Sequence, residues 1–366
     1  MTMTRRDWLR ATGALGVVGL AGCSGSGGSG GGADQPNRTG GETGQSTSAA
    51  RRPPTADRSL YLGHDIEHVS DNIVSGGVPK DGIPAIDDPK FGPASAAPLD
   101  PGDPVFGVVR DGKAKAYPQR ILVYHEVVND TIAGDPVAVT YCPLTGTAQG
   151  FDRGPVEFGV SGRLVNSNLT MYDRGTDSWW PQVLATAVRG EMQGATLREF
   201  RVVWTTWEAW QTEHPDTVVL TEDTGFQRRY GTDPYGSYNP KRGYYASAQT
   251  LFAPLESDDR VDPKRVVLGT RTTEGALTFD KETLLTDRVR TGDIGGTQYV
   301  AVADDALSTG YVYANPESVS VNAVEDGYRV GGETYTADSL PLERSLAFDG
   351  MWFAWAGFYP GVDYVR

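Results

Sequence analysis

The chain has 366 residues, of which 39% are hydrophobic, and its 47 acidic residues against 33 basic residues give a formal net charge of −14. Such an acidic surface excludes the nucleic-acid-binding classes, which need basic patches, so we expect no nucleic-acid partner. It suits a halophile-type protein kept soluble in high salt. The length allows one large globular domain or two smaller ones.

Residues 1–22 resemble an export signal of the twin-arginine type. The paired arginines Arg5 and Arg6 precede a short apolar run, residues 11–21. This run is too short to span a bilayer as a helix, which takes about 20 residues. The paired arginines are typical of the route that exports folded proteins. The LAGC stretch ending in Cys23 resembles a lipobox, in which the cysteine becomes lipidated. We therefore expect an extracytoplasmic protein, anchored through this lipid to the outer face of the cell membrane.

Residues 23–58 predict a disordered tether. Glycine, serine and threonine dominate, and no apolar residue recurs with a period. Such a segment cannot bury enough surface to offset its ordering entropy. A coil of this kind spans roughly 30–35 Å, which would hold a globular body just off the membrane.

The body, residues 59–366, is predicted to be mostly β, a β-rich α+β fold with a few short helices and long loops. Two apolar runs flank the turn pair Asp111-Gly112, a pattern typical of a hairpin. A second hairpin is predicted with its turn at residues 133–136. A short helix is expected over Thr206–His214, because Pro215 ends it. Residues 224–246 are rich in Gly, Tyr and Pro and predict a long irregular loop.

The body contains an internal similarity at an offset of 162 residues. Val105–Leu122 aligns with Val267–Leu284, and Gly107 falls on Gly269. This similarity predicts two related β units packed together, over about residues 105–200 and 267–340, with chance similarity of alternating strands as the alternative.

Cys142 is the only cysteine left after removal of residues 1–22 and lipidation of Cys23. If Ile132 lies opposite Val137, Cys142 and His125 share one face of the hairpin as diagonal neighbours, about 7–8 Å apart. A one-residue slip would place them on opposite faces. A thiol beside an imidazole can bind a soft metal or act as a nucleophile, and the alternative is a cysteine packed as a hydrophobic residue. The aligned positions of the second unit hold Asp287 and Asp305.

Residues 166–177 concentrate amide, carboxylate, guanidinium and aromatic groups. Polar-ligand and sugar pockets use such groups, and we expect a polar pocket here beside Cys142. The alternative is a strand and a turn over the core. The candidate pocket residues are Asn166, Asn168, Tyr172, Asp173 and Arg174.

Several long motifs carry a resemblance to a known family. They are DGIPAIDDPKF, AYPQRILVYHEVVNDTIAGDPVAVTYCPLTGTA, FGVSGRLVNSNLTMYDRGTDSWWPQ and FRVVWTTW. Together they resemble the family catalogued as domain of unknown function 3179, from about Asp81 to Trp180 and more loosely to the C-terminus. The resemblance implies no established activity. Many members have Cys-Pro-Leu-Cys where this chain has Cys-Pro-Leu-Thr, so Thr145 replaces a second cysteine and argues against a dithiol or two-thiolate site.

Three function classes stay open. The first is a soft-metal site, with copper as the cofactor, formed by Cys142 and His125. The second is a thiol enzyme, a transferase or hydrolase, with Cys142 as nucleophile, His125 as base, and Glu126 or Asp130 orienting the base. The third is a non-catalytic surface module that binds a glycan or a protein partner. A metal site requires a third ligand, and catalysis requires an open cleft, whereas a surface module requires neither. The ligand is a small molecule, a metal or a glycan.

Overall fold

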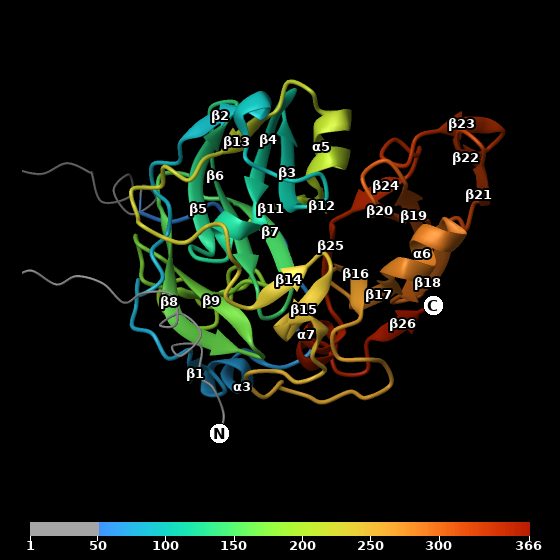
Figure 1. The fold of residues 1–366 in the computed structure, drawn as a ribbon. Helices are drawn as coiled ribbons and strands as arrows, with labels where there is room; N and C mark the ends of the chain where they lie inside the picture. Colours follow the sequence, from blue (N-terminus) through green and yellow to red (C-terminus); the bar gives the residue numbers. More distant parts are fainter. Residues whose placement is uncertain (1–50) are drawn as a thin grey trace, which may run out of the picture.

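A computed structural model describes residues 51–366 (Figure 1), a β-rich body of two related units with short helices and long loops between their strands. The first unit is coloured blue to yellow-green in Figure 1 and the second orange to red. The export signal, Cys23 and the tether as far as residue 50 lie outside the described residues. No helix of residues 51–366 is both long enough and apolar enough to cross a membrane.

The first unit contains two sheets. A five-stranded sheet has the order β12-β3-β4-β13-β2, and a four-stranded sheet has the order β11-β7-β6-β5. Neighbouring strands are antiparallel except β13, which runs parallel to β4. The strands are β2 (Phe91–Pro93), β3 (Pro104–Arg110), β4 (Lys113–Pro118), β5 (Val127–Ile132), β6 (Asp135–Cys142), β7 (Thr147–Asp152), β11 (Glu199–Phe200), β12 (Val203–Thr206) and β13 (Val218–Leu220).

The second unit repeats this plan. Its sheets have the orders β25-β16-β17-β26 and β18-β19-β20-β24, and β26 runs parallel to β17 as β13 does to β4. The strands are β16 (Val266–Arg271), β17 (Ala276–Asp280), β18 (Val289–Ile294), β19 (Thr297–Asp304), β20 (Thr309–Ala314), β24 (Glu343–Ser345), β25 (Ala347–Met351) and β26 (Asp363–Val365). The strands of residues 105–150 therefore occur along the chain, and pair with one another, in the same order as the strands of residues 267–315.

Short helices occupy the same places in both units. One helix connects the β3–β4 hairpin to β5, or the β16–β17 hairpin to β18. The other helix connects β12 to the parallel strand β13, or β25 to the parallel strand β26. The helices are α4 (Gln119–Leu122) and α5 (Trp207–Glu213) in the first unit, and α6 (Lys281–Asp287) and α7 (Trp352–Phe358) in the second. Thr206 caps α5 by accepting a hydrogen bond from the Ala209 amide, and His214 ends it. The helix predicted over Thr206–His214 is confirmed.

Further elements lie before the first unit, between the two units and within each of them. The insertion in the first unit forms a four-stranded sheet of order β1-β8-β9-β10, the insertion in the second a three-stranded sheet, and a hairpin lies between the units. These elements are β1 (Val74–Ser75), β8 (Phe158–Val165), β9 (Asn168–Asp173), β10 (Trp179–Pro181), β14 (Gly236–Tyr238), β15 (Lys241–Gly243), β21 (Val321–Val324), β22 (Gly327–Val330), β23 (Glu333–Tyr335), α3 (Ile66–Asp71), η1 (Ala94–Ala96) and η2 (Tyr244–Ala246).

The predicted register of the β5–β6 hairpin is wrong. Ile132 pairs with Asp135 rather than with Val137. The turn is shorter than predicted because Ala133 and Gly134, at φ 52° and 95°, form a two-residue connection. The second unit has the same register, so the counterpart of Cys142 is Asp304 rather than Asp305.

The end of the predicted tether, residues 51–58, lies on the body. Thr55 forms a β-bridge with Leu197, and the amide of Ala56 donates to the carbonyl of Thr196 at 2.8 Å. Pro53 is buried. These contacts order eight residues whose composition resembles that of the tether.

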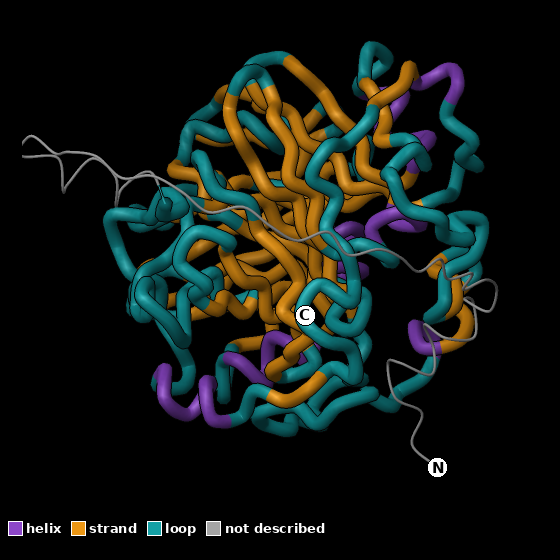
Figure 2. Tube along the Cα trace, turned by 90° about the vertical axis from the view of Figure 1, so that its left-hand side faces the viewer, coloured by secondary structure: helices purple, strands orange, loops and turns teal. Residues whose placement is uncertain are grey.

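The core lies between the sheets and is rich in aromatic side chains. Figure 2 shows the strands crowded at the centre, with loops and short helices outside them. Trp210 of α5 and Trp355 of α7 are fully buried, and each packs on a glycine of its unit, Gly107 or Gly269. The two units are joined by backbone and side-chain contacts, including the hydrogen bond from the Met351 amide to the Thr145 carbonyl at 2.9 Å.

Candidate functional site

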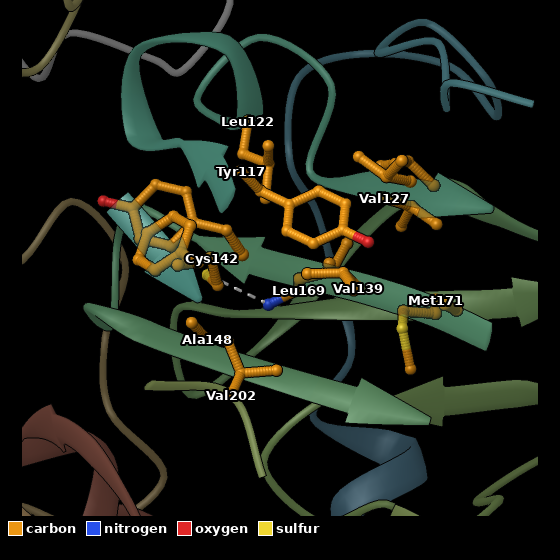
Figure 3. Close-up of a cluster of buried hydrophobic side chains, with 14 of the residues drawn as sticks. Tyr117, Leu122, Val127, Val139, Cys142, Ala148, Leu169, Met171 and Val202 are labelled. Atoms are coloured by element: carbon orange, nitrogen blue, oxygen red, sulfur yellow. Dashed lines mark hydrogen bonds between the residues drawn. The ribbon is translucent and has the colours of Figure 1, made fainter. Parts of the chain in front are cut away.

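Cys142 lies at the end of β6 inside the core of the first unit, with no exposed surface. Its sulfur accepts a hydrogen bond from the Leu169 amide at 3.3 Å, and its thiol donates to the Ser167 carbonyl at 3.6 Å. Figure 3 shows the residue among Tyr117, Leu122 and other buried side chains, with the bond to Leu169 dashed. The thiol is thus held by the backbone of the β8–β9 hairpin.

His125 lies in the turn after α4, before β5 begins. Its Nδ1 is 2.8 Å from the Pro84 carbonyl oxygen, and its Nε2 is 2.7 Å from the Tyr230 hydroxyl oxygen. Burial lowers the pKa of His125 to about 4, so the imidazole is uncharged at neutral pH. Both ring nitrogens therefore have hydrogen-bond partners, and neither partner is Cys142.

The structure gives the Cys142–His125 pair no shared ligand. Within residues 51–366, no group of three or more His, Cys, Asp or Glu side chains is placed to hold a metal ion. Cys142 also lines none of the four cavities described below. The geometry around Cys142 matches the packing alternative more closely than a metal site or a nucleophile.

We expect Cys142 to be inert to a water-soluble thiol reagent until the protein unfolds. The thiol is reached only through opening of the core, which costs at least about 5 kcal/mol in a typical domain. Labelling should therefore be at least about a thousandfold slower in the folded protein than in urea. Subtracting the signal of Cys142→Ser removes the contribution of Cys23. Fast labelling of the folded protein, with a pH dependence around neutrality, would contradict this expectation.

The two predicted pocket asparagines bind the protein itself. Asn166 donates to the Ala354 carbonyl at 2.8 Å and accepts from the Leu255 amide at 3.0 Å. Asn168 donates to the Thr145 hydroxyl at 3.0 Å and accepts from the Val183 amide at 2.9 Å. Both side chains are buried, so they tie loops to the core.

The remaining predicted pocket residues are buried in β9, as Tyr172 and Asp173 are, or exposed on the surface, as Arg174 is. Asp173 accepts hydrogen bonds from the Thr176 amide at 2.6 Å and from the Trp180 indole at 3.0 Å, and thereby closes the turn after β9. Tyr172 donates to Asp81 at 2.6 Å, and Arg174 bridges two surface carboxylates. None of the five candidate residues, Asn166 included, lines any of the four cavities.

A cavity of about 310 Å³ lies between the two units, beside the β14–β15 hairpin that Figure 1 shows between them. The first unit contributes the turn after β6 and strand β12, and the second contributes β16, α6 and β25. We call it the inter-unit cavity. It is lined by Gly146, Trp204, Tyr238, Lys241, Arg265, Val266, Lys281, Glu282, Leu285, Asp349 and Met351.

The charged groups of the inter-unit cavity are mostly paired. Lys281 forms an ion pair with Oδ2 of Asp349, and Arg265 pairs with Glu282 at 2.5 Å and with Asp280 behind it. Lys241 forms no ion pair or hydrogen bond through its side chain within residues 51–366. Oδ1 of Asp349 is buried and has no hydrogen-bond partner among the described residues. One ammonium group and one carboxylate oxygen of the cavity are therefore left for a ligand.

Aromatic rings form one wall of the inter-unit cavity. Tyr238 stacks on Tyr245 with ring centroids 3.9 Å apart, and its hydroxyl oxygen is 3.1 Å from that of Tyr141. Trp204 meets Tyr238 edge to face at 5.1 Å. The rings are fixed by their neighbours, so the wall is formed before any ligand arrives.

Three further cavities lie within one unit or along loops, with volumes of about 210, 470 and 560 Å³. The largest lies along the β3–β4 turn and the loop after α5, and the next along residues 248–263. Within residues 51–366, none of these three is lined by a buried carboxylate with an unpaired oxygen. The inter-unit cavity is therefore the stronger candidate site.

The inter-unit cavity was not predicted from the sequence. Its residues come from segments far apart in the chain, and none was among the candidate residues. The internal similarity between the two units could have indicated part of the cavity, because it extends beyond residue 315. Trp204 of β12 and Asp349 of β25 occupy equivalent strand positions, opposite Phe106 and Leu268. Both line the cavity.

The fold and the site define a two-unit β protein with a preformed cavity between its units. The chain belongs to the family described as "Protein of unknown function (DUF3179)", whose model matches residues 80–362. That match covers every strand of both units except β26, and every residue of the inter-unit cavity. No curated protein and no solved structure matches the chain.

Proposed function

We propose that the protein is a non-catalytic binding module, tethered to the outer face of the cell membrane through Cys23, and that it holds a small polar ligand in the inter-unit cavity. The twin-arginine signal, the lipobox and the acidic composition support the location. The cavity supports the binding, and the buried side chain of Asp349 carries the proposal.

Asp349 is only 7% exposed, and its Oδ1 lacks a hydrogen-bond partner within residues 51–366. A buried acceptor left without a donor costs about 1–3 kcal/mol, and native proteins keep few of them. Asp349 lines the cavity, so a molecule in the cavity would lie beside this carboxylate and would supply the missing donor once the carboxylate turns Oδ1 toward it. The unpaired oxygen thus favours a ligand with an N–H or O–H group.

The size of the inter-unit cavity favours a small ligand. Its volume of about 310 Å³ is near the lower limit of about 300 Å³ for small-molecule pockets. Apolar side chains from both units surround the charged groups, as in such pockets. A ligand here would touch both units at once, because Trp204 belongs to the first and Asp349 to the second.

Copper binding and thiol catalysis through Cys142 and His125 are weaker proposals. Each residue already has two hydrogen-bond partners in the core, and ligation or proton transfer would have to break these bonds. A third ligand has no candidate among the described residues.

We expect at least one member of a small probe panel to bind, and a tryptophan at Leu285 to weaken this binding at least about tenfold. Leu285 lines the cavity from α6, so the larger side chain fills the space that a ligand needs. The panel is glucuronate, glucose, benzoate and inorganic phosphate, measured by ligand-observed NMR.

Thr286→Trp is the matched control, since Thr286 is the next residue of the same helix, is exposed, and does not line the cavity. Its binding should equal that of the wild type. If no probe binds the wild-type protein, or if Leu285→Trp and Thr286→Trp bind alike, the inter-unit cavity is not the ligand site.

A further inference from the structure

We infer that the ligand of the inter-unit cavity is a saccharide that carries a carboxylate, such as a uronic acid. The inference rests on the proposed function, because it names the class of molecule that the same cavity takes. Three features carry it: a hydrogen-bond acceptor, an unpaired cation and an apolar wall.

The acceptor is Oδ1 of Asp349. Its carboxylate already forms an ion pair with Lys281 through Oδ2. A cationic ligand group at Oδ1 would gain little from the neutralised carboxylate and would be repelled by the Lys281 ammonium. A neutral donor keeps the hydrogen bond without that repulsion. Oδ1 therefore favours a hydroxyl group over an ammonium group.

The unpaired cation is Lys241 of β15. The cavity is lined by three cationic side chains, Lys241, Arg265 and Lys281, and by two carboxylates, Glu282 and Asp349. The other two cations are paired with carboxylates, and Asp280 behind Arg265 brings the carboxylates to three, so Lys241 is an unpaired cation and not an excess of charge. An anionic group on the ligand complements it.

The apolar wall is formed by Trp204, Tyr238, Leu285 and Met351. A pyranose ring presents C–H groups on its faces and hydroxyl groups on its edge. Its faces fit the apolar wall, and its edge reaches Asp349. Aromatic rings with such amphipathic partners are a common means of binding small polar molecules.

An aromatic carboxylate is the competing ligand class. Benzoate would fill the wall and meet Lys241, but it would leave Oδ1 of Asp349 without a donor. Glucose would satisfy Asp349 and leave Lys241 without an anion. Only glucuronate, among the probes, addresses all three features. The order of affinity therefore tests the ligand class.

We expect glucuronate to bind the wild-type protein about tenfold or more tightly than glucose or benzoate, as measured by isothermal titration calorimetry. Lys241→Ala should weaken glucuronate about tenfold and leave glucose unchanged. Arg242→Ala is the matched control, because Arg242 is the next exposed residue of the same hairpin and does not line the cavity.

Asp349→Ala should weaken glucuronate and glucose about tenfold and leave benzoate unchanged. The thermal unfolding of Asp349→Ala, compared with that of the wild type, reports any general loss of structure. If Asp349→Ala fails to fold, the comparison of Lys241→Ala with the wild type tests the inference.

Tighter binding of benzoate than of glucuronate, or equal glucuronate affinity in Lys241→Ala and the wild type, would overturn the saccharide inference. In that case the loss of benzoate binding in Leu285→Trp would still support the inter-unit cavity. Absence of binding by every probe would overturn both proposals.

Discussion

Replacing Arg271 with methionine should lower the free energy of unfolding by about 3–5 kcal/mol. Arg271 of β16 in the second unit donates from Nη2 to Oε1 of Glu199 of β11 in the first unit at 2.7 Å. The two side chains are 1% and 9% exposed. Burial raises the pKa of Glu199, and Arg271 opposes that effect. Without the guanidinium, the Glu199 carboxyl would have to stay buried as an unpaired charge or take up a proton.

The loss should be measured by urea denaturation, with the m-value checked for constancy. The double variant Arg271→Met/Glu199→Leu should recover most of the stability, since replacing both partners of a buried ion pair is often neutral. Arg52→Met is the matched control at an exposed pair, where Arg52 and Glu191 are 44% and 52% exposed. There we expect a loss of no more than about 1 kcal/mol. Equal losses in Arg271→Met and Arg52→Met would show that the buried inter-unit pair contributes no more to the free energy of unfolding than an exposed pair does.

Local patterns predicted much of the fold. The Asp111-Gly112 turn gave the β3–β4 hairpin because both residues take positive φ there. The α5 helix followed from its cap at Thr206 and from Pro215 beyond its end. The two related β units followed from the spacing of matched apolar residues, which strand pairing preserves. The hairpin and the helix depend on neighbours in sequence, and the two units depend on a repeated pattern that the sequence itself contains.

The register of the β5–β6 hairpin could not be predicted from the same patterns. It depends on Ala133 at φ 52°, a conformation that a non-glycine residue adopts at a cost. The sequence favours Gly134 alone for that role, and a longer turn ending at Pro136 fits the pattern equally well.

The burial of Cys142 and His125 could not be predicted from the sequence, because chemical reactivity says nothing of burial. Cys142 and His125 attracted attention as a thiol and an imidazole, but hydrogen bonds to Leu169 and Tyr230 hold each of them in the core. The inter-unit cavity instead depends on how the two units pack. Strand patterns do not show that Lys281 forms an ion pair with Asp349, or that Trp204 lines the same cavity.

Replacing Gly269 or Gly107 with alanine should destabilise the protein by about 3 kcal/mol each, at the upper end of the range for overpacking. A Cβ at Gly269 would lie 2.2 Å from ring carbons of Trp355, and a Cβ at Gly107 would lie 2.1 Å from Cζ3 of Trp210. Both tryptophans are fully buried, so neither ring can turn away into solvent. The strand or the helix must shift instead.

Thermal and urea unfolding of Gly269→Ala and Gly107→Ala should be compared with Gly92→Ala. A Cβ at Gly92 would approach only the Thr221 methyl group at 3.3 Å, and we expect a loss below about 1 kcal/mol. In a Trp355→Leu background, Gly269→Ala should cost much less than in the wild type, because the smaller side chain leaves room for the methyl group. Similar costs in both backgrounds would mean that the ring contact does not cause the loss. Similar losses at Gly107 and Gly269 are expected because each unit packs its tryptophan helix on the same strand position.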